Sequence, residues 1–133
     1  MFFKPTIKGV FVGLSLFLFC QCAEKFNEKD PTDFNRLLAA EPHIETAKEL
    51  ILLYYPFQGG ETPPPKITVA SLINQNFLIT LVDDYLADDA QKTTKVIMEA
   101  ERQDTLWRVN SIRVNFRCWP GRGLRNWGIA PCH

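Results

Sequence analysis

The sequence predicts an α+β fold in which N-terminal helices pack on an antiparallel sheet and a disulfide closes the C-terminal loop. Three observations support this class. Apolar residues recur at three- and four-residue intervals over 41–57, side chains alternate over 92–103 and 106–118, and two cysteines bracket the tail. A chain of 133 residues suits one domain and is too short for two independent cores.

The N-terminus predicts a secretory signal peptide of the lipoprotein type over residues 1–21. Two lysines precede an uncharged apolar run over 9–19, which is shorter than the roughly 20 residues that a membrane-spanning helix needs. The stretch LFCQC resembles a relaxed lipoprotein cleavage box, so Cys22 is the expected lipidated residue, and Cys20 fits less well. The alternative is an ordinary cleaved signal. With the lipid, we expect an exported protein anchored in the membrane, on the periplasmic or surface side of the bacterial cell envelope.

Residues 22–31 are polar and charged without an apolar period, which predicts a flexible tether. We expect the domain to occupy residues 32–133 and to begin with a helix over 32–40. Thr32 or Asp33 would cap this helix, and its buried face would carry three apolar residues, Phe34, Leu37 and Leu38.

A second helix is predicted over 41–57. Pro42 suits a first helical turn, and Pro56 ends the helix because proline cannot donate the backbone hydrogen bond. The stretch QGGETPPPK that follows predicts an extended linker.

The apolar residues of the next segment favour a third helix over 69–86. They lie at helical intervals and include Leu72, Phe77, Leu81 and Tyr85. Four aspartates over 83–89 would then lie at the C-terminal end of this helix, where we expect them to be solvated.

The alternating segments 92–103 and 106–118 predict a β-hairpin with its turn at Asp104. In the second segment, Trp107 and Val109 share one phase, whereas Ile112, Val114 and Phe116 share the other. One extra residue at Asn110 or Ser111, a β-bulge, would return all five side chains to one face of the sheet.

Two helices followed by long antiparallel strands with a Trp-x-Val-x-x-Ile element resemble the cystatin-like, nuclear-transport-factor-2-like superfamily. The resemblance is carried by AKELILLYY and by IMEAERQDTLWRVNSIRV. It implies a curved, cone-like sheet that wraps a helix, as in small uncharacterised bacterial lipoproteins. Members include isomerases, hydratases and non-catalytic binding proteins, so this fold does not assign a reaction.

Catalytic and metal-binding motifs are not found in the sequence. Enzymes of the superfamily generally place Asp and His inside an apolar pocket, but His43 precedes a helix and His133 ends the chain. The aspartate cluster lacks the spacing and glycine of a calcium loop, and no Cys or His pattern suits zinc. We expect no cofactor and no metal. Removal of the signal peptide with Lys4 and Lys8 would leave 13 basic and 15 acidic residues, a net charge of about −2, and nucleic acid is a poor partner for an exported protein of negative charge.

The tail forms the candidate site. We expect Cys118 and Cys132 to form a disulfide, because export supplies an oxidising compartment. Residues 105–133 contain five arginines and no acid, whereas all 15 acidic residues precede them. Candidate binding residues for an anionic ligand or an envelope protein are Arg117, Trp119, Arg122, Arg125 and Trp127. The alternative is internal packing, in which the arginines neutralise the acidic part of the chain.

These observations favour a non-catalytic binding or interaction module at the cell envelope. One alternative is a small hydrolase or isomerase that uses a cone-shaped pocket. The other is an envelope inhibitor or immunity-type protein that uses the exposed loop against an enzyme. A pocket containing a carboxylate and an aromatic residue would favour the enzyme.

The cleavage box predicts the start of the mature protein. Mass spectrometry of the purified protein is expected to give an N-terminal peptide that begins at Cys22 and carries a lipid. An unmodified N-terminus at Ala23 or Glu24 would exclude the lipid anchor.

Overall fold

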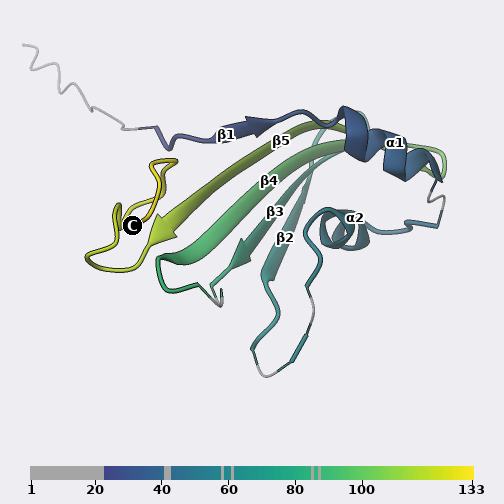
Figure 1. Cartoon of the computed structure of the whole chain (residues 1–133). Coiled ribbons are helices and arrows are strands. Elements are labelled where there is room, and N and C mark those ends of the chain that lie inside the picture. The colour runs from purple at the N-terminus through teal and green to yellow at the C-terminus, as the bar shows by residue number, and fades with distance from the viewer. Residues whose placement is uncertain (1–22, 41–42, 58, 61, 85, 87) are drawn as a thin grey trace, which may run out of the picture.

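The structure, a computed structural model, describes residues 23–133 apart from 41–42, 58, 61, 85 and 87. It contains two helices and a five-stranded antiparallel sheet of order β1-β5-β4-β3-β2 (Figure 1). The elements are β1 (Asn27–Lys29), α1 (Thr32–Ala40), α2 (Ala47–Tyr54), β2 (Lys66–Ser71), β3 (Asn76–Asp83), β4 (Gln91–Gln103) and β5 (Leu106–Cys118). The predicted α+β class is confirmed. The signal peptide, Cys20 and Cys22 lie outside the described residues, and no helix within those residues is long and apolar enough to cross a membrane.

Strand β1 lies within the segment that the sequence predicts to be a tether. Its three residues pair with β5, and Asn27 lies opposite Val114. Polar composition did not prevent pairing here, because an edge strand satisfies its backbone groups without burying its side chains. The part of the tether that is described is therefore attached to the sheet.

Helix α1 begins and ends as predicted, although its N-terminal cap differs. The carboxylate of Asp30 accepts hydrogen bonds from the backbone N–H of Thr32 at 2.9 Å and from its hydroxyl at 2.6 Å. Asp30 therefore satisfies the first turn, a role expected for Thr32 or Asp33. Phe34 and Leu38 are buried, whereas Leu37 is 44% exposed.

Helix α2 is shorter than the helix predicted over 41–57, because it begins at Ala47. The Thr46 hydroxyl accepts from the Glu49 N–H, and the Glu49 carboxylate accepts from the Thr46 N–H, each at 3.1 Å. This capping box fixes the first turn at Thr46. The helix ends at Tyr54, three residues short of the predicted bound at 57 but two before Pro56, the residue that the sequence predicts as its stop.

The helix predicted over 69–86 is wrong, since this segment forms the β2–β3 hairpin. Asn74 and Gln75 have positive φ angles of 57° and 58° and make the turn. Asparagine tolerates this left-handed conformation better than most residues, which supplies a turn without glycine. The isoleucine, valine and threonine content of the segment agrees with strands.

The β4–β5 hairpin and its bulge are confirmed. Glu99 pairs with Ser111 and Ala100 pairs with Val109, so Asn110 has no partner in the register. Trp107 and Val109 are consequently buried on the same face as Ile112, although their positions differ in parity. Val114 is partly buried against this core, whereas Phe116 is half-buried and lies outside it.

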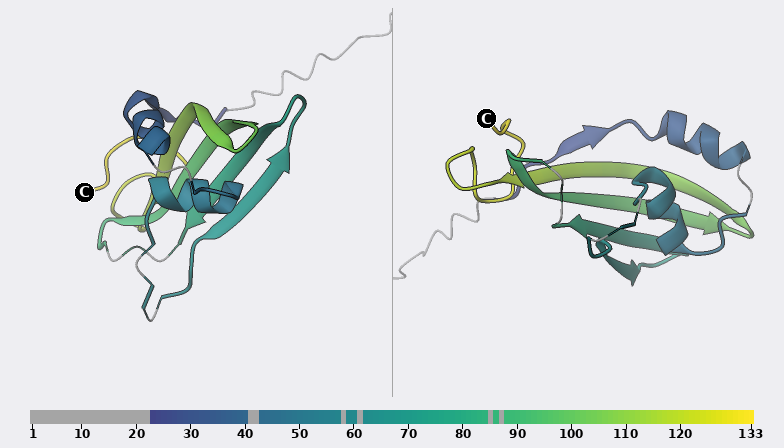
Figure 2. Two further views of the ribbon diagram at one scale, coloured as in Figure 1. Left: turned by 90° about the vertical axis from the view of Figure 1, so that its right-hand side faces the viewer. Right: turned by 60° about the horizontal axis from the view of Figure 1, so that its bottom comes forward.

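The core lies between the helices and one face of the sheet. Figure 2 shows α2 across this face and α1 beside β5. The buried cluster combines residues of both helices with residues of β3, β4 and β5: Phe34, Leu38, Ala47, Leu50, Ile51, Ile79, Leu81, Val96, Met98, Ala100, Trp107, Val109 and Ile112. We call this side the helix-bearing face, and the other side the opposite face.

The bulge is fixed by Asn35 on α1. Its Nδ2 donates to the carbonyl oxygen of Val109, and its Oδ1 accepts from the N–H of Val109, each at 2.8 Å. Strand β1 ends at Lys29, opposite Ile112, and does not reach this part of β5. The amide of Asn35 therefore replaces a neighbouring strand at the bulge.

We expect Asn35→Ala to lower the free energy of unfolding by about 1–3 kcal/mol, because it leaves both backbone groups of Val109 without partners. The matched control is Arg36→Ala on the same helix, which removes only an exposed ion pair to Asp33. That control should change stability by less than about 1 kcal/mol. Urea unfolding of both variants measures the difference, and equal effects would contradict the role of Asn35.

Candidate functional site

The tail is joined to the end of β5 by the predicted disulfide. Cys118 and Cys132 are bonded, with their Cα atoms 5.6 Å apart. The backbone N–H of Cys118 also donates to the carbonyl oxygen of Leu124 at 2.8 Å. Phe116 and Gly128 exchange two backbone hydrogen bonds of 3.0 Å, so the returning chain pairs with β5. The tail is thus a closed loop with a defined conformation.

Gly123 allows this loop to close. Its φ angle is 143°, and a Cβ atom at this position would lie 2.9 Å from the Sγ of Cys118. Real Cβ atoms do not approach sulfur so closely, so any larger residue would push the chain away from the disulfide. Gly121, with a φ angle of 79°, completes the turn around Arg122.

Arg117 and Trp127 form the centre of the site on the opposite face of the sheet. The guanidinium carbon of Arg117 lies 4.4 Å from the centroid of the Trp127 ring, and the Nζ of Lys95 lies 4.0 Å from it. Arg117 also donates to the Asp84 carboxylate and to the Thr93 hydroxyl, each at 3.3 Å. The cation–π contacts therefore attach Trp127 of the tail to β4 and β5, and the ion pair joins β5 to the end of β3.

The N-terminal segment is bound beside this centre. The Glu24 carboxylate accepts from the Nζ of Lys95 at 2.7 Å and from the Nδ2 of Asn115 at 3.3 Å. The hydrogen bond from Lys95 lowers the pKa of Glu24, with a smaller contribution from Asn115, so this group is an anion at neutral pH. Asn115 is fully buried and also donates to the carbonyl oxygen of Lys25 at 3.2 Å.

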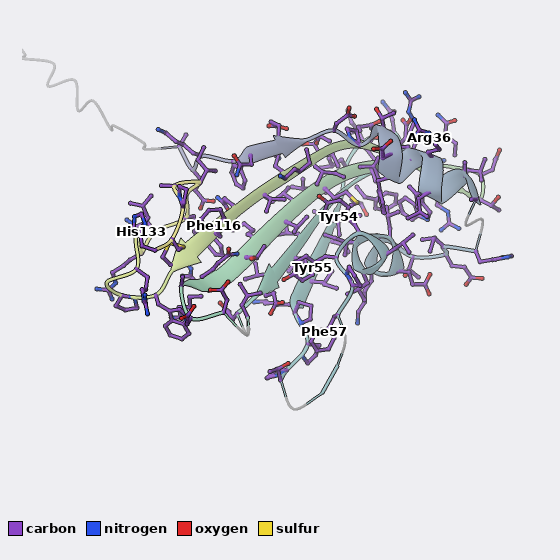
Figure 3. The ribbon with its side chains drawn as sticks, viewed as in Figure 1. Arg36, Tyr54, Tyr55, Phe57, Phe116 and His133 are labelled. Carbon is purple, nitrogen blue, oxygen red and sulfur yellow. A yellow bond between two sulfur atoms is a disulfide. The ribbon has the colours of Figure 1, made fainter. Side chains whose placement is uncertain are left out.

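A cleft of about 640 Å³ lies between residues 23–25 and the tail. Its lining combines three basic side chains, one acidic side chain and several apolar groups: Ala23, Glu24, Lys25, Arg117, Leu124, Arg125, Asn126, Trp127, Gly128, Ile129 and Ala130. Glu24 is already paired with Lys95, so the remaining charge of the lining is positive. Figure 3 shows His133 and Phe116 at this end of the sheet.

Three of the five predicted binding residues line the cleft, namely Arg117, Arg125 and Trp127. The indole N–H of Trp119 donates to the carbonyl oxygen of Asp88 at 3.1 Å, outside the cleft. Arg122 donates to the carbonyl oxygen of His133 at 3.2 Å and does not line the cleft. Internal packing thus accounts for Arg117 and Trp119, whereas Arg125 is exposed.

The sequence analysis did not predict three residues of the site, which are Lys95, Asn115 and Glu24. Lys95 has a detectable signal, because strand alternation places it on the polar side of β4. Asn115 gave no signal, because after the bulge it alternates with the apolar residues and shares its face with Arg113 and Arg117. Glu24 gave no signal, because its contacts join residues 71 and 91 positions apart in the chain.

Among the described residues, no group of three or more candidate ligands could hold a metal ion.

A second polar cluster lies on the helix-bearing face. The hydroxyl of Tyr55, just after α2, donates to the Asp83 carboxylate at 2.9 Å (Figure 3). Burial and the adjacent Asp83 raise the pKa of Tyr55 to about 12. Asp83 and Thr94 are buried, and Thr94 accepts from the side-chain amide of Gln91. The Tyr55 hydroxyl is therefore protonated at neutral pH, and its hydrogen bond to Asp83 joins the end of α2 to β3.

Among the four aspartates expected to be solvated, the expectation is wrong only for Asp83; Asp84, Asp88 and Asp89 are exposed. Asp83 is buried, Asp84 pairs with Arg117, and the carboxylate of Asp88 accepts from the backbone N–H groups of Ala90 and Gln91. The cluster begins with the last residue of β3 rather than at the end of a helix. Its members can therefore contact the end of the sheet, as Asp84 does through Arg117 of β5. The Asp84–Arg117 pair joins the acidic end of β3 to the basic end of β5.

Tyr55 is expected to give the protein a specific sensitivity to alkaline pH. Because its pKa is higher in the folded state than the ordinary value near 10, its contribution is complete below about pH 10 and is lost as the pH rises towards 12. Tyr55→Phe should therefore lose less stability than wild type over this range in urea unfolding. Tyr54→Phe is the comparison variant: burial also raises the pKa of Tyr54, though less than that of Tyr55, so this variant should fall between wild type and Tyr55→Phe, and equal losses in wild type and Tyr55→Phe would exclude this role.

The chain matches no known protein family, no curated protein and no solved structure. Function is therefore inferred from the cleft and from the side chains that line it.

Proposed function

We propose that this protein is a non-catalytic binding module of the bacterial cell envelope, exported and attached to the membrane by a lipid on Cys22. The cleft beside the disulfide-closed tail receives an anionic group of a ligand or of an envelope protein. The cone-like scaffold and the relation to the cystatin-like, nuclear-transport-factor-2-like superfamily belong to the same proposal.

The observation that carries the proposal is the position of Arg125. Its side chain lines the cleft, is exposed, and forms no ion pair with any residue that the structure describes. A guanidinium group in this state can bind a carboxylate or a phosphate with two parallel hydrogen bonds. Arg117 adds positive charge, although one of its nitrogens already donates to Asp84.

The apolar lining restricts the ligand further. Leu124, Trp127 and Ile129 contribute side chains to the same cleft as Arg125. Apolar walls combined with a few polar groups are typical of small-molecule sites, where the polar groups set the orientation. The ligand that fits best is an anion attached to an apolar group.

The closed loop supports binding because little conformational entropy remains to be lost. The disulfide, the backbone pairing of Phe116 with Gly128, and the contacts of Trp127 all exist without a ligand. A loop that is ordered before binding avoids part of the ordering cost of association. Residues 23–25 line the cleft and directly follow Cys22, so a lipid on Cys22 would keep the cleft near the membrane surface.

The test is a titration with hexyl phosphate and with inorganic phosphate, followed by tryptophan fluorescence. Hexyl phosphate should bind more tightly, because only its chain reaches the apolar lining. Arg125→Ala should weaken binding about tenfold, which corresponds to one charge-assisted hydrogen bond of about 1.5 kcal/mol. Its melting temperature should not change, because an exposed arginine adds little to stability.

Arg122→Ala is the matched control, because Arg122 lies in the same loop but donates to His133 outside the cleft. It should bind hexyl phosphate as wild type does. Cys132→Ser should weaken binding and also lower the melting temperature by several degrees, since the disulfide contributes about 3 kcal/mol in the chain-entropy description. Equal losses in the two arginine variants, or no binding of either phosphate, would refute the cleft as a binding site.

The Tyr55–Asp83 contact is the observation that favours the second candidate, a small hydrolase or isomerase. A carboxylate beside an aromatic hydroxyl is a common catalytic arrangement, but a phenol with a pKa of about 12 is a weak acid and an unsuitable base near neutral pH. An envelope inhibitor or immunity-type protein would use the tail against an enzyme. Purification of complexes from the native envelope separates these candidates, since an inhibitor would be recovered with an enzyme that it inactivates.

A further inference from the structure

The sheet has an open edge at β2, on the side opposite the tail. Strand β2 is the last in the sheet order, and no described strand pairs with its outer side. It has six residues, Lys66–Ser71, of which only Lys66 is charged, and Val69 is 47% exposed. Proteins usually protect such edges with charges, prolines or a covering element, because an open edge pairs readily with another strand.

The register shows which backbone groups face outward. The N–H of Leu72 donates to the carbonyl oxygen of Asn76 at 2.7 Å, across the β2–β3 turn. Because the direction of backbone groups alternates along an antiparallel strand, Ala70, Thr68 and Lys66 also face β3. The groups that face away from the sheet are therefore those of Ile67, Val69 and Ser71.

An apolar groove of about 350 Å³ lies between α2 and β2. It is formed by one residue of β2, two of α2 and four of the connecting loop: Ile67, Lys48, Leu52, Pro56, Phe57, Pro64 and Pro65. Ile67 contributes its side chain to this groove, while its backbone groups lie on the open edge. An open strand edge and an apolar groove therefore lie side by side.

Two lysines border the groove. Lys48 lines the groove, Lys66 begins β2, and none of the described lining residues is acidic. Glu49 follows Lys48, but its carboxylate already accepts from the backbone N–H groups of Glu45 and Thr46, at 2.8 and 3.1 Å. A carboxylate supplied by a partner would complement the two lysines.

We propose that β2 and this groove dock an extended, acidic segment of another protein, which joins the sheet as a sixth strand. The outward backbone groups of Ile67, Val69 and Ser71 supply the hydrogen bonds of strand addition. Because strand side chains alternate, one apolar side chain of the segment enters the groove beside Ile67, and the carboxylates next to it lie on the other face of the sheet, where they reach Lys66. This surface is separate from the cleft, so the two proposals are tested independently.

A second copy of this chain is a poorer occupant than an acidic segment. Pairing between two β2 strands would present residues 66–76 of each copy to the other, and this stretch contains no aspartate or glutamate. Neither Lys48 nor Lys66 would then meet a carboxylate from the partner's β2. The lysines at this edge therefore favour a segment that contains acidic residues over a second copy of β2.

The experiment uses the protein as its cell produces it, labelled with nitrogen-15, and three blocked peptides as probes. The first peptide is TEVEFEVT, the second is TKVKFKVT, and the third is TEVEFEVT with alternate backbone amides methylated. We expect only the first to shift the amide signals of β2 and of Lys48 at millimolar concentration. Methylation should weaken binding at least about tenfold, because it removes the strand hydrogen bonds on the peptide side.

Two variants test the protein side. Val69→Pro removes an outward N–H while leaving the bonds to β3, and should weaken binding of TEVEFEVT about tenfold. Lys66→Glu should weaken it by a similar factor and should restore some binding of TKVKFKVT. Arg125→Ala should bind TEVEFEVT as wild type does.

Three results would overturn the proposal. The first is the absence of β2 shifts with TEVEFEVT, and the second is equal binding of the methylated peptide, which does not depend on any variant folding. The third is a doubling of molecular mass without peptide that Val69→Pro abolishes, since this would identify a second copy as the occupant. Retained binding of hexyl phosphate in any of these cases would leave the cleft unaffected.

Discussion

The rest of the structure depends on the β-bulge at Asn110, a residue of β5 that has no partner on β4. A shift of one residue moves every following side chain of a strand to the other face. With Asn110 outside the register, Trp107 and Ile112 share the core, and Arg117 falls on the opposite face. One extra residue therefore lets a single strand supply apolar side chains to the core and a cation to the cleft.

The parts of the fold that the sequence predicts well are those with one clear period. The burial of β4 alternates from Thr94 to Glu101, and the fault in β5 locates the bulge. The hairpin over 66–83 was missed because β3 has apolar residues on both faces, with Phe77 and Leu81 on one and Leu78 and Val82 on the other. A strand that is apolar on both sides has no period of two, so its spacing also satisfies a helix.

The candidate site was predictable only where its members lie close in the chain. The disulfide and the arginine–tryptophan content of the tail are local features, and both cysteines lie within 15 residues of the C-terminus. The cleft, by contrast, depends on Glu24 meeting Lys95 and Asn115, which only the sheet register brings together. Tertiary contacts likewise decide which arginines are paired. Arg117 forms an ion pair with Asp84, whereas Arg125 lines the cleft without an ion pair to any described residue.

Both described ends of the chain lie at the same end of β5, since Lys25 is bound by Asn115 and the returning tail pairs with Phe116. The turns at Asn74 and Asp104 lie at the other end of the sheet, because Asn76 pairs with Glu101 and Gln103 pairs with Leu106. This arrangement decides where a fluorophore or an affinity tag can be attached. A tag on His133 would stand on the closed loop three residues beyond Ala130, which lines the cleft, whereas a small insertion in either turn would lie at the far end of the sheet.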